Sequence, residues 1–287
     1  MQKGQKKRKI RPAQKLRSKQ GKEERMVPQP VYEKEKNVLR LRNKIAVITG
    51  GDSGIGKAVA IAFAKEGAHV VIAYREDHKD ATATADRIKE IGQQVLLIPG
   101  DVSKAAHCKK IIQQTIKQFG RIDILVNNAA VQFPQKELKS ISEKQLRETF
   151  EVNFFAYVYM AQAAEQYLDE GACIINTTSV TAYRGSAHLI DYSSTKGAIV
   201  SFTRSLSGYF AEKKIRVNAV APGPVWTPLI PATFPPSHVA SFGSDVPLGR
   251  AGEPVEIAYA YVFLASDDAS YITGQVIHPN GGEIINT

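Results

Sequence analysis

Short runs of apolar residues alternate with stretches of helical periodicity from Asn43 onward. The runs expected to form strands are residues 44–49, 69–74, 94–99, 122–127, 172–178, 215–220 and 275–279. Between them, segments such as GKAVAIAFAKEG and AHCKKIIQQTIKQFG repeat apolar residues three and four positions apart, as amphipathic helices do. Continuous apolar strands separated by helices are typical of buried parallel strands joined by helical crossovers. The pattern therefore predicts a single doubly wound α/β domain over residues 43–287, with a seven-stranded parallel sheet and helices on both faces.

Residues 1–42 differ from this domain in charge and in apolar content. They hold 15 of the 38 Lys and Arg but only 4 of the 28 Asp and Glu, so the basicity behind the net charge of +10 is an N-terminal feature. So polar a segment cannot bury enough surface to offset the entropy of ordering, which predicts a mostly disordered extension. Its role stays open between a solvated or subunit-wrapping arm, which we favour, a nucleic-acid-binding tail and a targeting segment.

The remaining composition is that of an ordinary globular protein, with 43% hydrophobic and 23% charged residues. No apolar run is long enough to span a bilayer, and no signal peptide is evident. Cys108 and Cys173 form no CxxC pair and have no histidine at ligand spacing. These features argue against disulfides and a metal site, and they predict a cytoplasmic location.

A glycine-rich stretch, TGGDSGIGKAVA, lies where the first expected strand passes into the first expected helix. Glycines at Gly50, Gly54 and Gly56 permit a tight turn and a close approach of the backbone to a phosphate. The following helix N-terminus offers free amide groups and the positive end of the helix dipole. In the first strand–helix unit this motif predicts a Rossmann-type dinucleotide site, although glycines alone also make plain turns.

The end of the second expected strand, AYRED, bears on the choice of cofactor. A site for NAD usually has an acid there, which accepts a hydrogen bond from the ribose. Here Tyr74 occupies that position and Arg75 follows, and an arginine can pair with the 2′-phosphate of NADP. The pattern favours NADP(H), with NAD(H) still possible because Glu76 and Asp77 could neutralise Arg75.

Tyr192 and Lys196 are four residues apart in IDYSSTKGA, so both lie on one face of an expected helix. A free phenol has a pKa of about 10, and a fixed positive neighbour lowers it. The pair is either a tuned acid or an incidental pair on a solvated helix face, and the two residues alone do not decide between them.

Several motifs occur together in the order and spacing of one family. They are TGGDSGIG (49–56), GDV (100–102), NNAA (127–130), Asn153, Ser179, YSSTK (192–196) and PGPVWT (222–227). From about Asn43 onward the chain resembles the short-chain dehydrogenase/reductases, and within them the glucose/ribitol dehydrogenase-like and bacterial stress-type members. One departure is Ala130, where the family usually has glycine.

The resemblance implies an NAD(P)-dependent oxidoreductase that interconverts an alcohol and a carbonyl. It makes Tyr192 the general acid and base, and Lys196 the residue that lowers its pKa and contacts the nicotinamide ribose. Ser179 would stabilise charge on the substrate oxygen, and Asn153, exposed in mid-helix, would hold a water for proton relay. Taken singly, Ser179 could be a capping serine, Asn153 a packing amide and Tyr192 a ring packed on the cofactor.

The resemblance also implies the cofactor contacts. Asp101 and Val102 would flank the adenine, and Asn128 and Ala129 the ribose. Pro222 and Gly223 would place Val225 and Thr227 against the nicotinamide. The full set expected to bind the cofactor is Gly50, Asp52, Ser53, Gly54, Ile55, Gly56, Tyr74, Arg75, Asp101, Val102, Asn128, Ala129, Tyr192, Lys196, Pro222, Gly223, Val225 and Thr227.

Residues 224–247 are too rich in proline to form one regular helix, and they are expected to be a substrate lid. Trp226, Phe133, Gln132 and His188 are candidate pocket residues. Their mix of aromatic and polar groups suits a sugar, a polyol or a small carbonyl compound.

The segments around Asn153 and Tyr192 are apolar on more than one face, which indicates subunit contacts, and the family is commonly tetrameric. Two other classes of function remain as alternatives. One is a non-catalytic nucleotide-binding sensor or scaffold, and the other is nucleic-acid binding through the basic tail.

Overall fold

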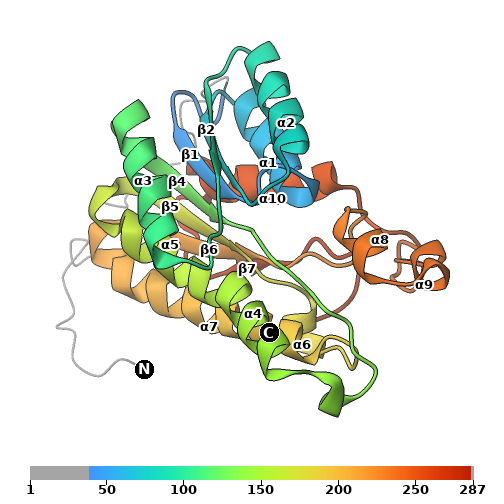
Figure 1. Ribbon diagram of the computed structural model, residues 1–287. Helices are drawn as coiled ribbons and strands as arrows, with labels where there is room; N and C mark the ends of the chain where they lie inside the picture. Colours follow the sequence, from blue (N-terminus) through green and yellow to red (C-terminus); the bar gives the residue numbers. More distant parts are fainter. Residues whose placement is uncertain (1–38, 286–287) are drawn as a thin grey trace, which may run out of the picture. The chain divides into compact units, whose positions relative to one another are not determined.

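A computed structural model describes residues 39–285 and shows a twisted sheet between two layers of helices (Figure 1). The strands are β1 (Ile45–Thr49), β2 (His69–Tyr74), β3 (Val95–Pro99), β4 (Ile122–Asn127), β5 (Leu168–Thr177), β6 (Arg216–Val220) and β7 (Val276–Ile277). Every strand pair is parallel, and the order across the sheet is β3-β2-β1-β4-β5-β6-β7. The predicted fold class is therefore confirmed.

The helices cover both faces of the sheet and enclose two apolar cores. On one face lie α1 (Gly54–Lys65), α2 (His78–Glu90) and α10 (Pro254–Ala265), and on the other α3 (Ala105–Phe119), α5 (Ala156–Ala164) and α7 (Ile190–Phe210). All residues of β1 and β4 are buried, because helices cover them from both sides. This double cover is why these strands are continuous apolar runs in the sequence.

Two strands differ in length from their expected ranges. β5 begins at Leu168, four residues before the apolar run, because exposed residues 169–171 continue the strand past a register shift opposite Ile122 and Ile124. β7 lies at the sheet edge and pairs with β6 at only two positions. Edge pairing and a polar strand end leave no continuous apolar run from which such limits could be read.

The segment around Asn153 is not one regular helix. It consists of α4 (Glu143–Phe150), one turn of π-helix (Glu151–Phe155) and then α5. A π-turn inside an α-helix is rare and is frequent at functional sites. Here it carries Asn153 into the interior, where its side chain is fully buried.

The region expected to be a lid contains two short helices, α8 (Leu229–Thr233) and α9 (Pro236–Ala240). They project beside the carboxyl end of the sheet (Figure 1). The remaining short elements are α6 (Thr181–Arg184) and the 3₁₀ turns at Leu138–Ser140, Glu165–Tyr167, Ala211–Lys213 and Asp267–Ala269.

The compact unit begins at Leu39, and its first residues are attached to the end of α1. Leu41 is fully buried, its amide donates to the Glu66 carbonyl at 2.9 Å, and Arg40 pairs with the Glu66 carboxylate. The part of the predicted disordered extension that precedes Leu39 lies outside the described residues. Over residues 39–285, no helix is both long and apolar enough to cross a membrane.

Candidate active site

A cavity of about 880 Å³ opens at the carboxyl ends of the strands, beside the point where the strand order reverses between β1 and β4. Ligands of doubly wound folds bind at this switch point. Of the residues expected in the site, the lining includes Gly50, Asp52, Ser53, Gly54, Ile55, Tyr74, Arg75, Asp101, Val102, Asn128, Ala129, Ser179, Tyr192, Lys196, Pro222, Gly223, Val225 and Thr227. Gly56 and Asn153 are not among the residues that line the cavity.

The glycine-rich turn has the shape that a phosphate requires. Gly50 and Gly54 have φ angles of +65° and +53°, in the left-handed region that favours glycine. A Cβ on Gly56 would lie 1.9 Å from the Gly50 carbonyl oxygen, so no other residue fits there. The helix α1 that follows has no side-chain cap from Ser53 and no acid in its first turn. Its free amide groups therefore suit an anion such as the pyrophosphate of a dinucleotide.

The end of β2 holds the groups expected near the adenosine. Arg75 is exposed, lines the cavity, and makes no hydrogen bond or ion pair within residues 39–285. Tyr74 is buried, and its hydroxyl shares a 2.8 Å hydrogen bond with His78 Nδ1. Burial raises the pKa of Asp52, and the nearby charge of Asp77 raises it further.

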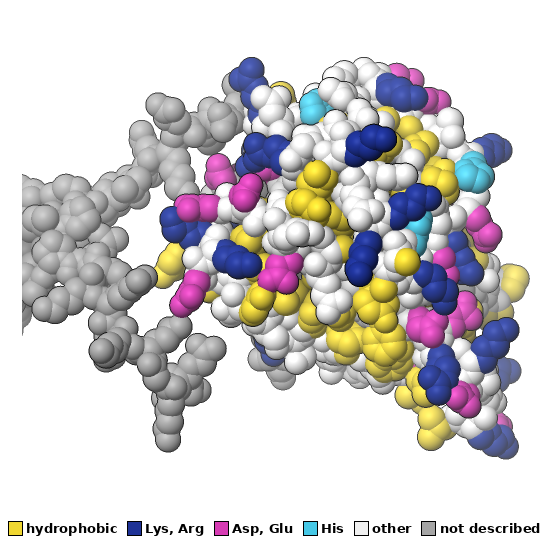
Figure 2. Space-filling model, turned by 60° about the vertical axis from the view of Figure 1, so that its left-hand side comes forward, with side chains coloured by type: hydrophobic (Ala, Val, Ile, Leu, Met, Phe, Trp, Pro, Cys, Tyr) yellow, Lys and Arg dark blue, Asp and Glu magenta, His cyan; other side chains and the backbone are white. Residues whose placement is uncertain are grey.

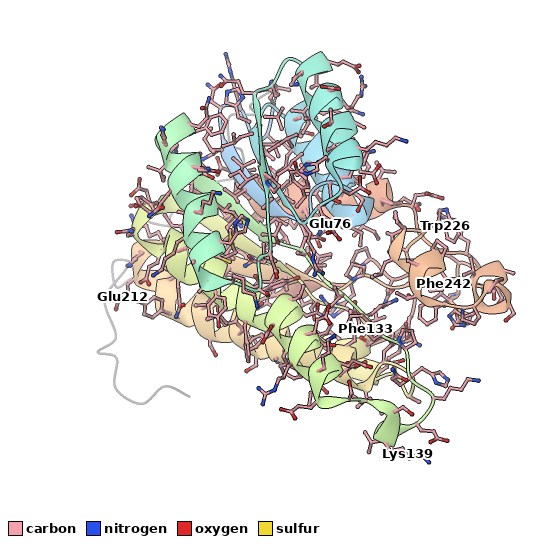
Figure 3. The ribbon with its side chains drawn as sticks, viewed as in Figure 1. Glu76, Phe133, Lys139, Glu212, Trp226 and Phe242 are labelled. Carbon is pink, nitrogen blue, oxygen red and sulfur yellow. The ribbon has the colours of Figure 1, made fainter. Side chains whose placement is uncertain are left out.

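Asp101 faces the same part of the cavity after β3. Burial alone would raise the pKa of its carboxyl, but hydrogen bonds from Ser103 and the charges of Arg75 and Lys104 lower it overall. The carboxylate accepts from the Ser103 amide at 2.9 Å. The resulting anion lines the part of the cavity where the adenosine is expected. In Figure 3, Glu76 marks this end of the site, while Phe133 lies on the opposite side.

Tyr192 and Lys196 come together on α7. The Lys196 Nζ atom lies 5.3 Å from the centre of the Tyr192 ring and donates to the Thr177 carbonyl at 2.9 Å. Lys196 is 1% exposed, whereas Tyr192 is half-buried at the cavity wall. The helix spacing thus produces the predicted pair at the cavity.

In the protein alone, the pKa of Tyr192 is shifted in the opposite direction to the lowering expected from Lys196. Burial raises the pKa of Tyr192 to about 12, against a smaller lowering by its hydrogen bond with Ser179. Burial also lowers the pKa of Lys196 to about 7. Both groups lose water, and desolvation favours their neutral forms. The tyrosine therefore holds its proton at neutral pH.

Ser179 follows β5 and is held by the start of α6. Its Oγ atom accepts from the Thr181 amide at 3.2 Å and from the Thr181 hydroxyl at 3.1 Å. Ser179 also shares a hydrogen bond with the Tyr192 side chain. It thus bonds to the first residue of α6 and to the phenol at once, although the N-cap of α6 is Val180.

Asn153 is not exposed, contrary to the expectation. Its Oδ1 atom accepts from the Val131 amide at 2.8 Å, and its Nδ2 atom donates to the Val131 carbonyl at 2.9 Å and to Thr195 Oγ1 at 3.3 Å. The π-turn directs the side chain inward, where it fixes the loop after β4 against α7.

The turn after β6 lines the part of the cavity where the nicotinamide is expected. Gly223 packs so closely on the C-terminal segment that a Cβ there would be 2.7 Å from Asn280 Cα. Thr227 lies against Gly54, 3.3 Å from the position of a Cβ on that glycine. The turn thus brings the end of the chain and the glycine-rich turn to one site.

Two of the four candidate pocket residues line the cavity, namely Gln132 and His188, and Phe133 and Trp226 do not.

Sequence reasoning also missed Asp191, a buried carboxylate next to Tyr192. The available signal was an acidic residue at an inward position of an otherwise apolar helix face. Within residues 39–285, no group of three or more histidine, cysteine and acidic side chains is placed to hold a metal ion.

Comparison with known proteins gives the same class of protein that the sequence motifs resemble, the short-chain dehydrogenase/reductases. A protein-family model described as enoyl-(acyl carrier protein) reductase matches residues 50–283. A glucose and ribitol dehydrogenase of Daucus carota is 49% identical, over 96% of this chain and 97% of that protein. An NADPH-dependent aldehyde reductase 1, chloroplastic, of Arabidopsis thaliana is 50% identical, over 86% of this chain and 88% of that protein.

Among solved structures, a short-chain dehydrogenase from Burkholderia cenocepacia in complex with NADP superposes with a TM-score of 0.80. It is 29% identical, and the match covers 85% of this chain and 98% of that one. Fold, site and relatives thus define a nicotinamide-dependent oxidoreductase. The chain belongs to the short-chain dehydrogenase/reductase family, with similarity to its glucose/ribitol dehydrogenase-like members.

Proposed function

We propose that this protein interconverts a small alcohol and the corresponding carbonyl compound, with Tyr192 as general acid and base and with NADP(H) as the favoured cofactor. The observation that carries the proposal is the convergence of Ser179, Tyr192 and Lys196 on the cavity that also contains the glycine-rich turn. A sensor that only binds a nucleotide has no use for a phenol, a hydroxyl and an ammonium grouped in this way.

The cradle around Gly56 and the uncapped start of α1 fit the phosphates of a dinucleotide. Residues from the ends of β2 and β3 would hold its adenosine, and the turn after β6 its nicotinamide. When bound, the nicotinamide supplies or accepts the hydride, while the protein supplies position and charge.

The side chains of the protein then transfer the proton to or from the substrate oxygen. In reduction, the Tyr192 hydroxyl donates its proton to the substrate oxygen, and the Ser179 hydroxyl donates a hydrogen bond to that oxygen as it gains charge. The high pKa of Tyr192, about 12, keeps the phenol protonated for this step. In oxidation, Tyr192 must first lose its proton, and nearby positive charge, including that of the oxidised cofactor, favours the phenolate.

Arg75 supports the preference for NADP(H). It is exposed at the end of β2, near the Asp101 carboxylate, and makes no hydrogen bond or ion pair over residues 39–285, so its guanidinium can pair with the 2′-phosphate. The relatives described as NADPH-dependent or bound to NADP support the same choice. Replacing Arg75 with glutamine should raise the KM for NADPH by about tenfold and leave the KM for NADH nearly unchanged.

The test is reduced-nicotinamide absorbance with a panel of sugars, polyols, aldehydes and ketones, with each cofactor in turn. Wild type is compared with Tyr192→Phe, which removes the acid and keeps the ring. We expect the variant to lose activity by at least about 100-fold while it still binds NADPH. Cofactor binding without turnover of any compound would favour the sensor or scaffold instead.

We also propose a homotetramer. Large apolar side chains are exposed on the segments around Asn153 and Tyr192, namely Leu146, Phe155, Ile190 and Tyr209. Figure 2 shows hydrophobic side chains gathered on the lower part of the face where α5 and α7 lie. Light scattering on the purified protein would measure the assembly.

Both cysteines are buried and free, which supports the predicted cytoplasmic location.

A further inference from the structure

Gln132 links the loop after β4 to the lid. It is 6% exposed and lines the cavity that also contains Ser179 and Tyr192. Its Nε2 atom donates to Thr233 Oγ1 at 2.8 Å, and Thr233 is the last residue of α8. The Thr233 hydroxyl in turn donates to the Leu229 carbonyl at 2.7 Å, so its hydrogen is already used and it can only accept from Gln132.

The other end of the Gln132 amide is open to the cavity. Over residues 39–285, no hydrogen bond uses its Oε1 atom, and this atom is not among the fully buried polar atoms that have no partner. An accessible acceptor on a largely desolvated side chain favours a ligand that donates a hydrogen bond to it. The preceding residue, Val131, also lines the cavity, and its side chain is apolar and offers no donor to Gln132.

We propose that Gln132 Oε1 accepts a hydrogen bond from a second hydroxyl of the substrate, one that does not react. The same amide holds α8 through Nε2, so recognition of this hydroxyl is joined to the position of the lid. The site then selects hydroxylated aldehydes and polyols over plain ones. This inference rests on the proposed function and specifies its substrate class.

The test compares glyceraldehyde with propionaldehyde, which has the same carbon chain without the two hydroxyls, in the presence of NADPH. Gln132→Leu removes both ends of the amide and keeps the volume. Thr233→Val removes only the contact with the lid and serves as the matched control. Thermal unfolding of each variant shows whether it is folded.

We expect Gln132→Leu to lower the ratio of kcat/KM for glyceraldehyde over propionaldehyde by about tenfold. Thr233→Val should lower both values by the same factor and leave the ratio unchanged. An unchanged ratio in Gln132→Leu overturns the inference, as does a wild type that does not prefer glyceraldehyde.

A second measurement separates this inference from the proposed reaction. Calorimetry measures the binding of erythritol and of 1-butanol, which has only one hydroxyl, to the protein loaded with NADP. Erythritol should bind wild type about tenfold more tightly than Gln132→Leu, with no such difference for 1-butanol. If neither aldehyde is turned over but erythritol binding depends on Gln132, the reaction is wrong and the hydroxyl site stands. Equal binding to both proteins refutes the site.

Discussion

At the scale of single residues, burial decides the charges of the site, and Lys196 shows this most directly. Its pKa is about 7 in the folded protein against an ordinary 10.5. Between these values the unfolded chain binds a proton that the folded chain does not, so the free energy of unfolding rises with pH. Below about pH 7 both states are protonated, and the folded state bears the full cost of the buried charge.

We therefore expect the stability of wild type relative to Lys196→Met to rise by about 1 kcal/mol per pH unit between pH 7 and 9. Urea unfolding at several pH values measures this difference. The exposed Lys109 provides a control, because Lys109→Met should run parallel to wild type. A difference for Lys196→Met that stays constant with pH would show that the lysine is not desolvated as described.

Gly56 makes a steric prediction. A methyl group there would sit 1.9 Å from the Gly50 carbonyl oxygen, so Gly56→Ala must displace the backbone of the glycine-rich turn. We expect loss of NADPH binding, measured by fluorescence titration, together with a lower unfolding temperature. The helical Gly197 has free space around its Cβ position, so Gly197→Ala should instead stabilise the fold by about 0.5–1 kcal/mol. Normal NADPH binding by Gly56→Ala would contradict the close approach.

At the scale of elements, one buried network joins α4, α7 and the loop after β4. Asp191 Oδ2 accepts from Gln145 Nε2 and from Thr149 Oγ1, each at 2.9 Å. Gln145 also donates to the Phe133 carbonyl at 3.1 Å. Asp191 Oδ1 accepts from the Tyr192 amide at 2.9 Å, so the carboxylate connects α4 and the loop after β4 to the start of α7, which carries Tyr192.

Asp191 is therefore a positioning residue. Asp191→Asn places an amide donor against at least one other donor, which leaves a buried polar group unpaired at a cost of about 1–3 kcal/mol. We expect the KM for the carbonyl substrate to rise about tenfold, with the KM for NADPH within about twofold, because the network touches only the substrate side. Steady-state kinetics with each substrate varied in turn gives the two values.

The matched control is Ser142→Ala. Ser142 caps α4 by accepting from the Gln145 amide at 3.1 Å, but it makes no contact with the Asp191 carboxylate. Its loss should cost about 1 kcal/mol of stability and leave both KM values unchanged. If Ser142→Ala raises the substrate KM as much as Asp191→Asn does, the effect reflects the stability of α4 and not positioning.

The same elements show which features a sequence can predict. The strands on both sides of β1 are buried on two faces, so each appears as a continuous apolar run. Helix spacing predicts that Lys196 lies near Tyr192. The position of the glycines between a strand and a helix predicts the glycine-rich turn. In contrast, the π-turn that buries Asn153 leaves no trace in apolar periodicity, because it adds one residue to a helical stretch.

Long-range contacts are equally invisible in the sequence. The bonds of Gln132 to Thr233 and of Asp191 to Gln145 join segments that are 101 and 46 residues apart. The direction of the Tyr192 pKa shift also depended on packing. Helix spacing indicates that Lys196 is near, but only the buried structure shows that both groups lose their water.

At the scale of the whole molecule, charge is divided unevenly along the chain. Residues 1–38 hold 13 of the 38 Lys and Arg and 4 of the 28 Asp and Glu, so the remainder is nearly balanced. The compact unit begins at Leu39, and every proposed site residue lies within it. Catalysis and any binding of polyanions by the basic extension should therefore be separable by truncation.

We expect a chain that begins at Leu39 to keep kcat and KM within about twofold of the full-length protein, because no site residue is removed. A chain that begins at Lys44 also loses the fully buried Leu41 and should be less stable by about 2–4 kcal/mol. Steady-state assays and urea unfolding of the two truncations measure these effects. Equal stability of the two would show that residues 39–43 do not hold the domain together.

The same pair of proteins tests nucleic-acid binding. If the extension contacts phosphates, binding of the full-length protein to a DNA duplex weakens steeply with salt, and the chain from Leu39 does not bind. We expect at most weak binding, with a dissociation constant of about 10⁻⁴–10⁻⁶ M that has no dependence on DNA sequence. Fluorescence anisotropy from 50 to 200 mM salt, about the range over which phosphate contacts are lost, gives the slope. Salt-dependent binding that persists after truncation would place the polyanion site on the domain, whose near-neutral charge predicts none.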